Sequence, residues 1–267
     1  MRTLDACPKP ALLLSFDFDG TLHDPADKPP VPTDFFTTIR RLRETKGAVW
    51  GINTGRSMPQ VMEGFIESSF PFLPDWVIAR EREIYFPNAF GRFLAHKDWN
   101  DRCEKDIAKL FKKSKKTLKK VRYEIEEHTG AQYIEMKGEP AGLISRTEEE
   151  MEWIAAHIAP LMAEVPGLGW QRNSIYLRFG HKDYQKGSTL TEMARLYDIP
   201  TSHVFAMGDS HNDIEMLSEA HSGGAACPAN AVEAIRQIIT ERGGLVASKN
   251  AGHGVVEALQ TIFPDNV

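Results

Sequence analysis

The sequence predicts an α/β protein with a mainly parallel sheet. Apolar runs at residues 11–16, 48–52 and 203–207 each end in a polar loop that contains glycine. Short continuous runs of this kind are typical of buried parallel strands, because helices cover both faces of such a sheet. Helical periodicity between the runs then predicts a Rossmann-like core of three layers.

The opening third of the chain predicts repeated β-α units. A strand at residues 11–16 is followed by a helix at 34–45, and a strand at 48–52 is followed by a helix at 58–68. A further short strand is expected at residues 76–79. Each unit adds one parallel strand, so functional side chains are expected at the carboxyl ends of these strands.

The middle of the chain changes character and predicts an inserted α+β domain. We expect, in order, a lysine-rich helix at residues 99–120, strands at 121–127 and 132–136, a helix at 147–165 and a strand at 174–179. The lysines lie around the whole helix, which favours a solvated surface over an anion site. This inserted domain is assigned to residues 86–180.

The β-α pattern returns after the insertion. A helix is expected at residues 186–197, then the strand at 203–207 and a helix from about residue 213. The core is therefore assigned to residues 1–85 and 181–267.

Composition and charge restrict the possible partners. The chain is 42% hydrophobic and 26% charged, which is ordinary globular material, and its net charge of -5 gives no overall attraction to nucleic acid or to an anionic membrane. We expect neither as a partner.

Three dispersed cysteines without a CxxC pair argue against a disulfide framework or a zinc site, and no apolar run is long enough for a signal peptide or a membrane span. A cytoplasmic protein is expected.

Four carboxylates predict a magnesium site. Asp17 and Asp19 follow the first strand with one residue between them, so both are expected on the same side of the sheet edge. Asp209 and Asp213 follow a later strand whose carboxyl end converges on the same crevice. Oxygen ligands with room for water suit Mg²⁺, which is the predicted cofactor.

Three further features make this a candidate site for phosphoryl transfer. Asp17 is an ionised nucleophile that needs no base to activate it. Thr54 follows the second strand and can offer its hydroxyl and its backbone amide to a phosphoryl oxygen. Lys186 stands at a predicted helix start and can place a positive charge beside the phosphoryl group.

Four motifs in this order resemble those of the haloacid-dehalogenase superfamily of phosphatases, in the group that carries a large cap between the second and third motifs. They are Asp17-Phe18-Asp19-Gly20-Thr21, Thr54-Gly55-Arg56, Lys186-Gly187 and Gly208-Asp209-Ser210-His211-Asn212-Asp213. The resemblance implies that Asp17 attacks phosphorus and that Asp19 protonates the leaving oxygen and then deprotonates water. It also implies that Asp209 binds magnesium with support from Asp213.

The resemblance extends to substrate contacts, with one departure. Motif residues implied at the substrate are Gly20, Thr21, Gly55, Arg56 and Asn212. Such phosphatases often carry Asn-Gly in the loop after the third strand, where this chain has Glu81-Arg82. Substrate details therefore do not transfer across this loop.

Two residues of the inserted domain allow two interpretations. Glu135 and Lys137 are weakly similar to cap residues of trehalose- and sucrose-phosphate phosphatases, where such a pair meets the sugar. They are equally well explained as surface residues on an edge strand.

The predicted activity is hydrolysis of a phosphomonoester with magnesium through an aspartyl phosphate. We expect a small phosphorylated metabolite as substrate, with a sugar phosphate favoured and discrimination arising in the inserted domain. A phosphomutase or phosphotransferase, or a non-catalytic ligand-binding domain, remains as the alternative. The intact motifs disfavour the last of these, while the exact substrate and the oligomeric state are left open.

Overall fold

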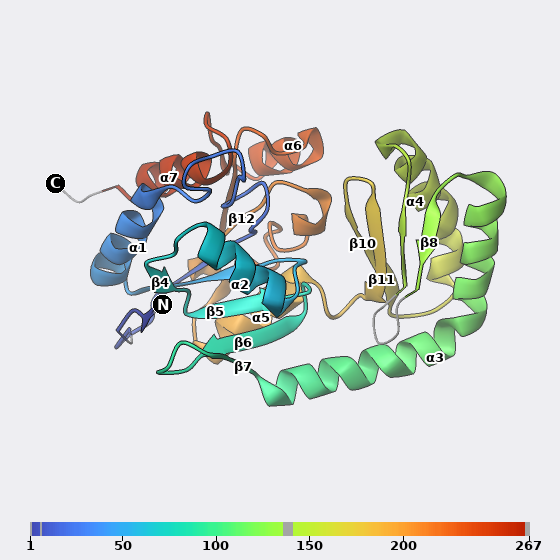
Figure 1. The fold of residues 1–267 in the computed structure, drawn as a ribbon, viewed down its shortest axis with the longest axis horizontal. Helices are drawn as coiled ribbons and strands as arrows, with labels where there is room; N and C mark the ends of the chain where they lie inside the picture. The colour runs from blue at the N-terminus through green and yellow to red at the C-terminus, as the bar shows by residue number, and fades with distance from the viewer. Residues whose placement is uncertain (1, 6, 136–140, 265–267) are drawn as a thin grey trace. The chain divides into compact units, whose positions relative to one another are not determined.

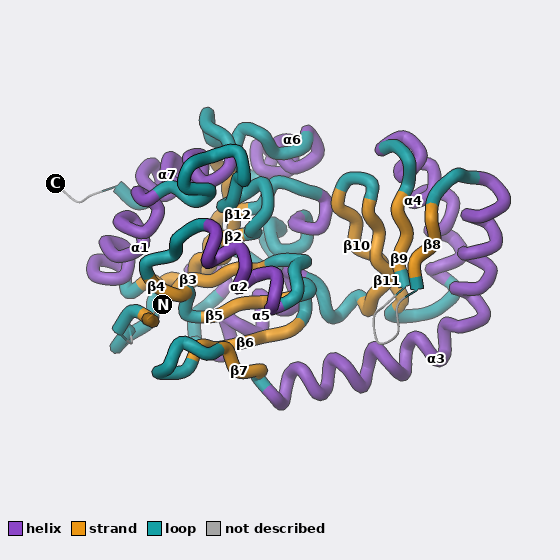
Figure 2. Tube along the Cα trace, viewed as in Figure 1, coloured by secondary structure: helices purple, strands orange, loops and turns teal. Residues whose placement is uncertain are grey.

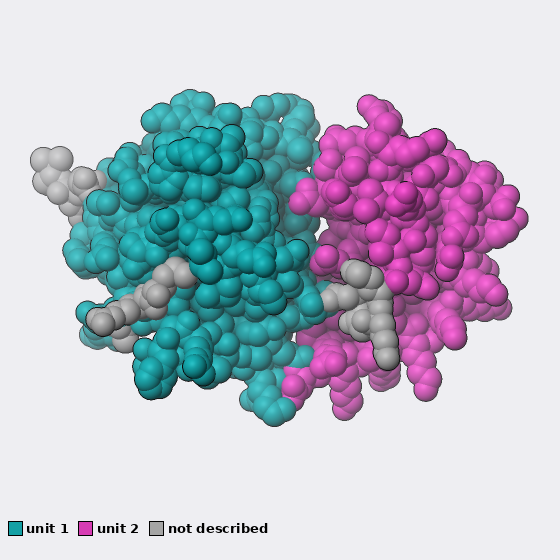
Figure 3. Space-filling model, viewed as in Figure 1, with its two compact units in different colours: residues 1–100, 186–267 teal, residues 101–185 magenta. Residues whose placement is uncertain are grey.

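The computed structural model describes residues 2–5, 7–135 and 141–264 (Figure 1). The chain divides into two units, which Figure 3 colours separately. Unit 1 comprises residues 1–100 and 186–267, and unit 2 comprises residues 101–185.

Unit 1 is built on an eight-stranded sheet in the order β14-β13-β12-β2-β3-β5-β6-β7. All neighbours from β14 to β5 are parallel, while β6 and β7 extend one edge by antiparallel pairing. The strands are β2 (Leu12–Phe16), β3 (Ala48–Asn53), β5 (Trp76–Ala79), β6 (Glu83–Pro87), β7 (Phe93–Ala95), β12 (Val204–Met207), β13 (Gly224–Cys227) and β14 (Leu245–Val246). A separate parallel pair joins β1 (Arg2–Thr3) to β4 (Phe72–Leu73).

The central strands are apolar because they are buried on both faces. Leu14 and Phe16 of β2 join the core cluster that also holds side chains of three helices. Leu13, at the alternate position, points to the opposite face of the sheet and is also fully buried. The helices of unit 1, drawn in purple in Figure 2, are α1 (Thr33–Lys46), α2 (Met58–Glu67), α5 (Lys186–Leu196), α6 (Glu233–Glu241) and α7 (Ala251–Ile262), with α1 packed against α7.

Unit 2 has its own four-stranded antiparallel sheet and its own core. The order is β10-β11-β9-β8, formed by β8 (Gln132–Ile134), β9 (Gly142–Ile144), β10 (Leu168–Asn173) and β11 (Tyr176–His181). Leu143, Leu177 and Phe179 of this sheet pack with apolar side chains of α3 (Lys97–His128) and α4 (Glu148–Ala163). The Thr147 side chain caps α4 by accepting from the Glu150 amide, which explains where this helix begins.

The predicted α/β class with a mainly parallel sheet is confirmed. It stays a prediction that one domain carries the catalytic residues and that the inserted domain acts as a cap that selects the substrate. Across the described part of the chain, every helix is too short or too polar to cross a membrane.

Two local predictions are wrong. Residues 121–127 form the end of α3 instead of a strand, because Leu118, Val121 and Ile125 are buried at helical spacing. The helix expected from residue 213 is a 3-10 turn at His211–Asp213 followed by further turns. Its tight geometry follows from the Asp213 carboxylate, which accepts the amides of Asp209 and Ser210.

One strand is shifted from its expected position. The strand expected at residues 174–179 is β11, displaced because Ser174 adopts a left-handed φ of 50° in a two-residue turn between paired Asn173 and Tyr176. The strand expected at residues 132–136 is described only as β8, and residue 136 lies outside the described residues.

Candidate active site

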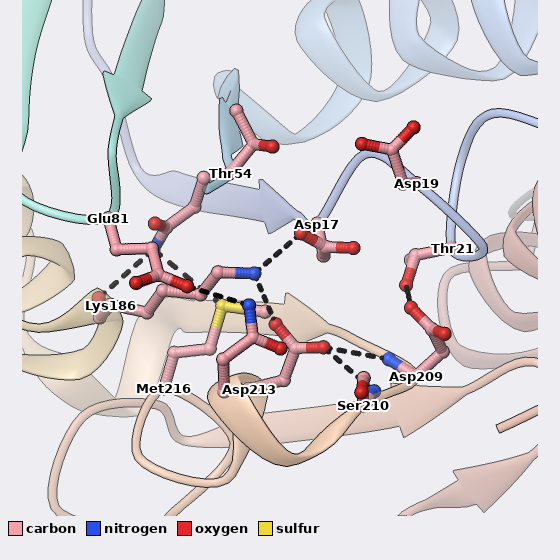
Figure 4. A network of polar contacts seen from close by, with 12 residues as sticks. Asp17, Asp19, Thr21, Thr54, Glu81, Lys186, Asp209, Ser210, Asp213 and Met216 are labelled. Atoms are coloured by element: carbon pink, nitrogen blue, oxygen red, sulfur yellow. Dashed lines mark hydrogen bonds and ion pairs between the residues drawn. The ribbon is translucent and has the colours of Figure 1, made fainter. Parts of the chain in front are cut away.

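Loops after the parallel strands bring most of the predicted core residues together in unit 1 (Figure 4). Asp17 follows β2, Thr54 follows β3 and Asp209 lies just beyond β12, while Lys186 opens α5. Carboxyl ends of parallel strands lie at one edge of the sheet, so motifs that are distant in sequence meet there.

Lys186 is the cation at the centre of this group. Its side chain is fully buried, and Nζ donates to Asp17 Oδ1 at 2.5 Å and to Asp213 Oδ1 at 2.6 Å. Burial by itself lowers the pKa of Lys186, but the carboxylates of Asp17 and Asp213 outweigh burial and raise its pKa above the usual value. The ammonium therefore stays charged and holds one oxygen of Asp17 in place.

The carboxylates around Lys186 carry more negative charge than one cation balances. Burial, with the charges of Asp213 and Asp209, raises the pKa of Asp17 against the opposing effect of Lys186. Burial and the charge of Asp213 raise the pKa of Asp209 to about 6. Crowded carboxylates of this kind are stabilised by a further cation.

The residues present fit a magnesium ion. Asp17, Asp209 and Asp213 can each offer one oxygen, and these oxygens lie within 4.8 Å of one another. An all-oxygen ligand set is the one that Mg²⁺ prefers. Asp213 is the most engaged of the three, since Oδ1 accepts from Lys186 and Oδ2 accepts two backbone amides.

Asp19, also predicted as a ligand, lies outside this group of three. The Arg56 guanidinium donates two hydrogen bonds to its carboxylate, from Nε to Oδ2 at 2.7 Å and from Nη2 to Oδ1 at 2.5 Å. Figure 4 shows the Asp19 side chain pointing away from that of Asp17. The side chain of Asp19 is about half exposed at 47%, and its role as acid and base stays a prediction.

The loop after β2 depends on Gly20 and Thr21. Thr21 Oγ1 donates to Asp209 Oδ1 at 2.7 Å, which ties the first motif to the fourth. Gly20 has a left-handed φ of 77°, and a Cβ there would lie 2.6 Å from Asp209 Oδ2. Only glycine allows the two loops to approach this closely.

Gly20→Ala should therefore damage the site beyond its backbone cost. A left-handed φ costs an L-residue about 1–2 kcal/mol, and the clash must also displace Asp209. Gly243→Ala is the matched control, because Gly243 has a φ of 69° and nothing lies within 4 Å of its added Cβ. We expect similar losses of unfolding free energy from φ alone, with activity lowered about tenfold or more only in Gly20→Ala. Equal activity in the two variants would contradict the steric account.

Thr54 and Asn212 are placed differently from what the motifs suggest alone. The backbone amide of Thr54 already donates to the Ile78 carbonyl at 2.9 Å, so the expectation that it serves a phosphoryl oxygen is wrong. Its hydroxyl is the group that can donate to a ligand. Asn212 donates from Nδ2 to Glu81 Oε1 at 2.7 Å.

Several supporting residues were given no role from sequence. Asn53 is fully buried and donates from Nδ2 to the Lys186 carbonyl at 3.0 Å. Asn230 donates to the Gly20 carbonyl at 2.7 Å and accepts from the Ala251 amide. The position of Asn53 directly before the Thr54 motif could have indicated its role from sequence. Asn230 stands in no recognisable motif.

The two candidate residues of the inserted segment fall within residues 101–185, which make up unit 2. Glu135 belongs to unit 2, is exposed, and lies 3.8 Å from the Arg122 guanidinium. Lys137 lies outside the described residues. Their part in substrate recognition stays a prediction.

Comparison with known proteins gives one family. The family model described as haloacid dehalogenase-like hydrolase matches residues 65–259. A curated relative, the phosphoglycolate phosphatase of Methanoculleus marisnigri, is 36% identical over 81 residues. These residues are 30% of this chain and 31% of that relative, so the match spans about a third of the relative's length.

Solved structures show the same fold over nearly the whole chain. The sucrose-phosphatase of Synechocystis, solved with sucrose and phosphate, has a TM-score of 0.71 at 15% identity and covers 94% of this chain and 98% of its own. A haloacid dehalogenase-like hydrolase of Bacillus subtilis has a TM-score of 0.67 at 18% identity, with coverage of 98% and 95%. At sequence identities this low, the structural likeness shows the fold alone.

Proposed function

This chain belongs to the haloacid dehalogenase-like hydrolase family, and within that family we propose that it is a magnesium-dependent phosphatase acting through an aspartyl phosphate on Asp17. The family predicted from the four motifs is confirmed, and with it the class of hydrolase. The observation that best supports the proposal is the buried Lys186 ammonium, which contacts both Asp17 and Asp213.

The first half-reaction moves the phosphoryl group to the protein. A carboxylate oxygen of Asp17 forms a bond to phosphorus while the bond from phosphorus to the leaving oxygen breaks. Asp19 gives its proton to that oxygen, and the leaving group departs as an alcohol. Lys186 keeps Asp17 oriented and offsets the charge that gathers on the phosphoryl oxygens, and the Thr54 hydroxyl donates to one of them.

The second half-reaction returns the protein to its starting state. Asp19, now ionised, takes a proton from water, and the water oxygen bonds to phosphorus as the bond to Asp17 breaks. Inorganic phosphate leaves. Asp17 and Asp209 would hold a magnesium ion, with Asp213 and Asp19 as further candidate ligands, and the ion would supply positive charge beside the phosphoryl oxygens.

The Arg56 grip on Asp19 belongs to this cycle. Both carboxylate oxygens of Asp19 accept from Arg56, whereas an acid needs one of these oxygens to face the leaving group and donate a proton to it. Asp19 therefore has to leave Arg56 before it can protonate the leaving oxygen. In that state Arg56 is free to contact the substrate, the role that its motif position implies.

The proposed substrate is a small phosphorylated metabolite, with a sugar phosphate favoured. Support comes from the fold of a sucrose-phosphatase and from the partial match to a phosphoglycolate phosphatase, both of which act on small phosphorylated molecules by name. Gly20, Thr21, Gly55 and Asn212 are proposed to line the phosphate end of the site. Discrimination among leaving groups is assigned to the inserted domain.

A panel of phosphorylated metabolites tests this function. With Mg²⁺ present, we expect inorganic phosphate from at least one sugar phosphate at a rate well above the background of buffer alone. Isomerised or transferred phosphate without free phosphate would point to a mutase or phosphotransferase instead. If a verified folded protein released no phosphate from sugar, nucleotide or carboxylic-acid phosphates, the result would contradict the proposal.

A further inference from the structure

Glu81 is an acidic residue buried beside the proposed phosphate site. It follows β5, and only 4% of its surface is exposed. Figure 4 shows its side chain beside Thr54 and Lys186. Its Oε1 lies 3.5 Å from the position that a Cβ on Gly55 would occupy.

The backbone at Glu81 adopts a conformation that is costly for this residue type. Arg80 and Glu81 have left-handed φ values of 50° and 67°. Two hydrogen bonds maintain this turn, from the Glu81 amide to the Thr54 carbonyl at 2.8 Å and from the Arg80 amide to the Arg56 carbonyl at 2.8 Å. A glycine or asparagine would adopt this φ more readily, so the glutamate is explained by its side chain.

The side chain of Glu81 determines which way Asn212 faces. Its Oε1 accepts from Asn212 Nδ2 at 2.7 Å, and the amide NH₂ group of an asparagine can only donate. The NH₂ group of Asn212 must therefore face Glu81, which directs Oδ1 away from it. Within the described ranges, Asn212 Oδ1 is buried and has no hydrogen-bond partner. Such an atom is costly to leave unpaired, which indicates a donor supplied by a ligand.

Glu81 also connects the loops of the site. Its carbonyl accepts from the hydroxyl of Thr189 in α5 at 3.3 Å, one turn beyond Lys186. Backbone and side chain together thus contact the Thr54 loop, the helix of Lys186 and the turn that carries Asn212 and Asp213. A negative charge does not suit direct contact with a phosphate, so Glu81 is expected to act through Asn212.

We propose that Glu81 is a positioning residue for phosphoryl transfer, which fixes the side-chain amide of Asn212 so that its carbonyl oxygen Oδ1 faces a donor on the bound substrate. This inference rests on the proposed function. Because Oδ1 can only accept, the group it meets is a hydroxyl, an amine or a coordinated water on the ligand side.

A double-mutant cycle tests the proposal. Glu81→Ala and Asn212→Ala should each lower kcat about ten- to a hundredfold, the loss expected when a group that contacts the substrate is displaced. KM should change less than about threefold. Their combination should be no worse than either alone, because both remove one interaction. Glu81→Gln retains an acceptor for Asn212 Nδ2 and should recover most of the loss. Glu83→Ala, on the neighbouring strand, is the control and should leave turnover unchanged.

Multiplying losses in the double variant, or a Glu81→Gln variant as slow as Glu81→Ala, would overturn the proposal. A second readout does not need turnover. The Asn212 side-chain amide resonance, assigned by its disappearance in ¹⁵N-labelled Asn212→Ala, should move in Glu81→Ala and stay in place in Glu83→Ala. A resonance that does not respond to Glu81→Ala overturns the positioning role whatever the activity. A response in a protein that releases no phosphate would support the positioning role while the proposed function fails.

Discussion

Asp17→Asn is expected to lower phosphate release on the order of 10⁴-fold or more, because it removes the nucleophile of a covalent mechanism. The introduced amide keeps the size of the side chain, and its oxygen can still accept from the Lys186 ammonium. KM should change little, since the loss falls on the chemical step. Initial rates on the best phosphomonoester, with trace contamination excluded by an independent preparation, give the measurement.

The protein should remain folded in this variant. The pKa of Asp17 is raised by burial and by Asp213 and Asp209, so its ionised form does not favour the folded state at neutral pH. A carboxyl of this kind contributes stability at low pH that is lost as pH rises through its folded pKa. Asp17→Asn also takes one of its two carboxylate partners from the buried Lys186 ammonium, so the two effects oppose one another and we expect only a small shift of the unfolding midpoint at pH 7.

A matched substitution at the protein surface controls for the change from aspartate to asparagine itself. Asp183→Asn makes the same chemical change at a side chain that is 81% exposed, and it should retain full activity. Near-normal turnover of Asp17→Asn, or an aspartyl phosphate trapped on a different residue, would overturn the covalent mechanism.

Removal of divalent metal is expected to abolish turnover, with a loss of at least about a hundredfold. The oxygens of Asp17, Asp209 and Asp213 lie within 4.8 Å of one another, the Lys186 ammonium contacts two of these carboxylates, and a phosphate ester adds further negative charge. Without a second cation the ester is repelled. Dialysis against chelator followed by metal analysis and an activity assay makes the measurement, and added Mg²⁺ should restore the rate. Full activity after verified removal would exclude the metal.

Binding of Mg²⁺ gives a readout that is independent of turnover. Ligation requires ionised carboxylates, and the pKa of Asp209 is raised to about 6. Asp209 is therefore largely ionised at pH 7.5 and largely protonated at pH 5, so Mg²⁺ affinity should fall about tenfold between these values. Calorimetric titration at the two pH values measures it. An affinity that does not change with pH would remove Asp209 from the ligand set.

The sequence predicted the parallel sheet well because its central strands are buried on both faces. Such strands need continuous apolar runs, and these are readable without knowledge of any partner. Short strands such as β9 and β14 were missed, since two or three residues carry no periodicity. The end of α3 was misread as a strand, because Val121 and Ile125 are β-branched residues whose helical spacing shows only together with Leu118.

The sequence by itself determined which side chains could perform chemistry here. Asp17, Thr54, Lys186 and Asp209 follow strand ends or open a helix, positions that a local pattern identifies. Their convergence follows from the rule that parallel strands share one carboxyl edge.

Only the tertiary structure decided how these side chains are held. The Arg56 grip on Asp19, the closeness of Gly20 to Asp209 and the contact of Glu81 with Asn212 join residues from different loops. The last pair is 131 positions apart along the chain. A hydrogen bond depends on tenths of an ångström, and a local pattern of residue types carries no information about distances between distant segments.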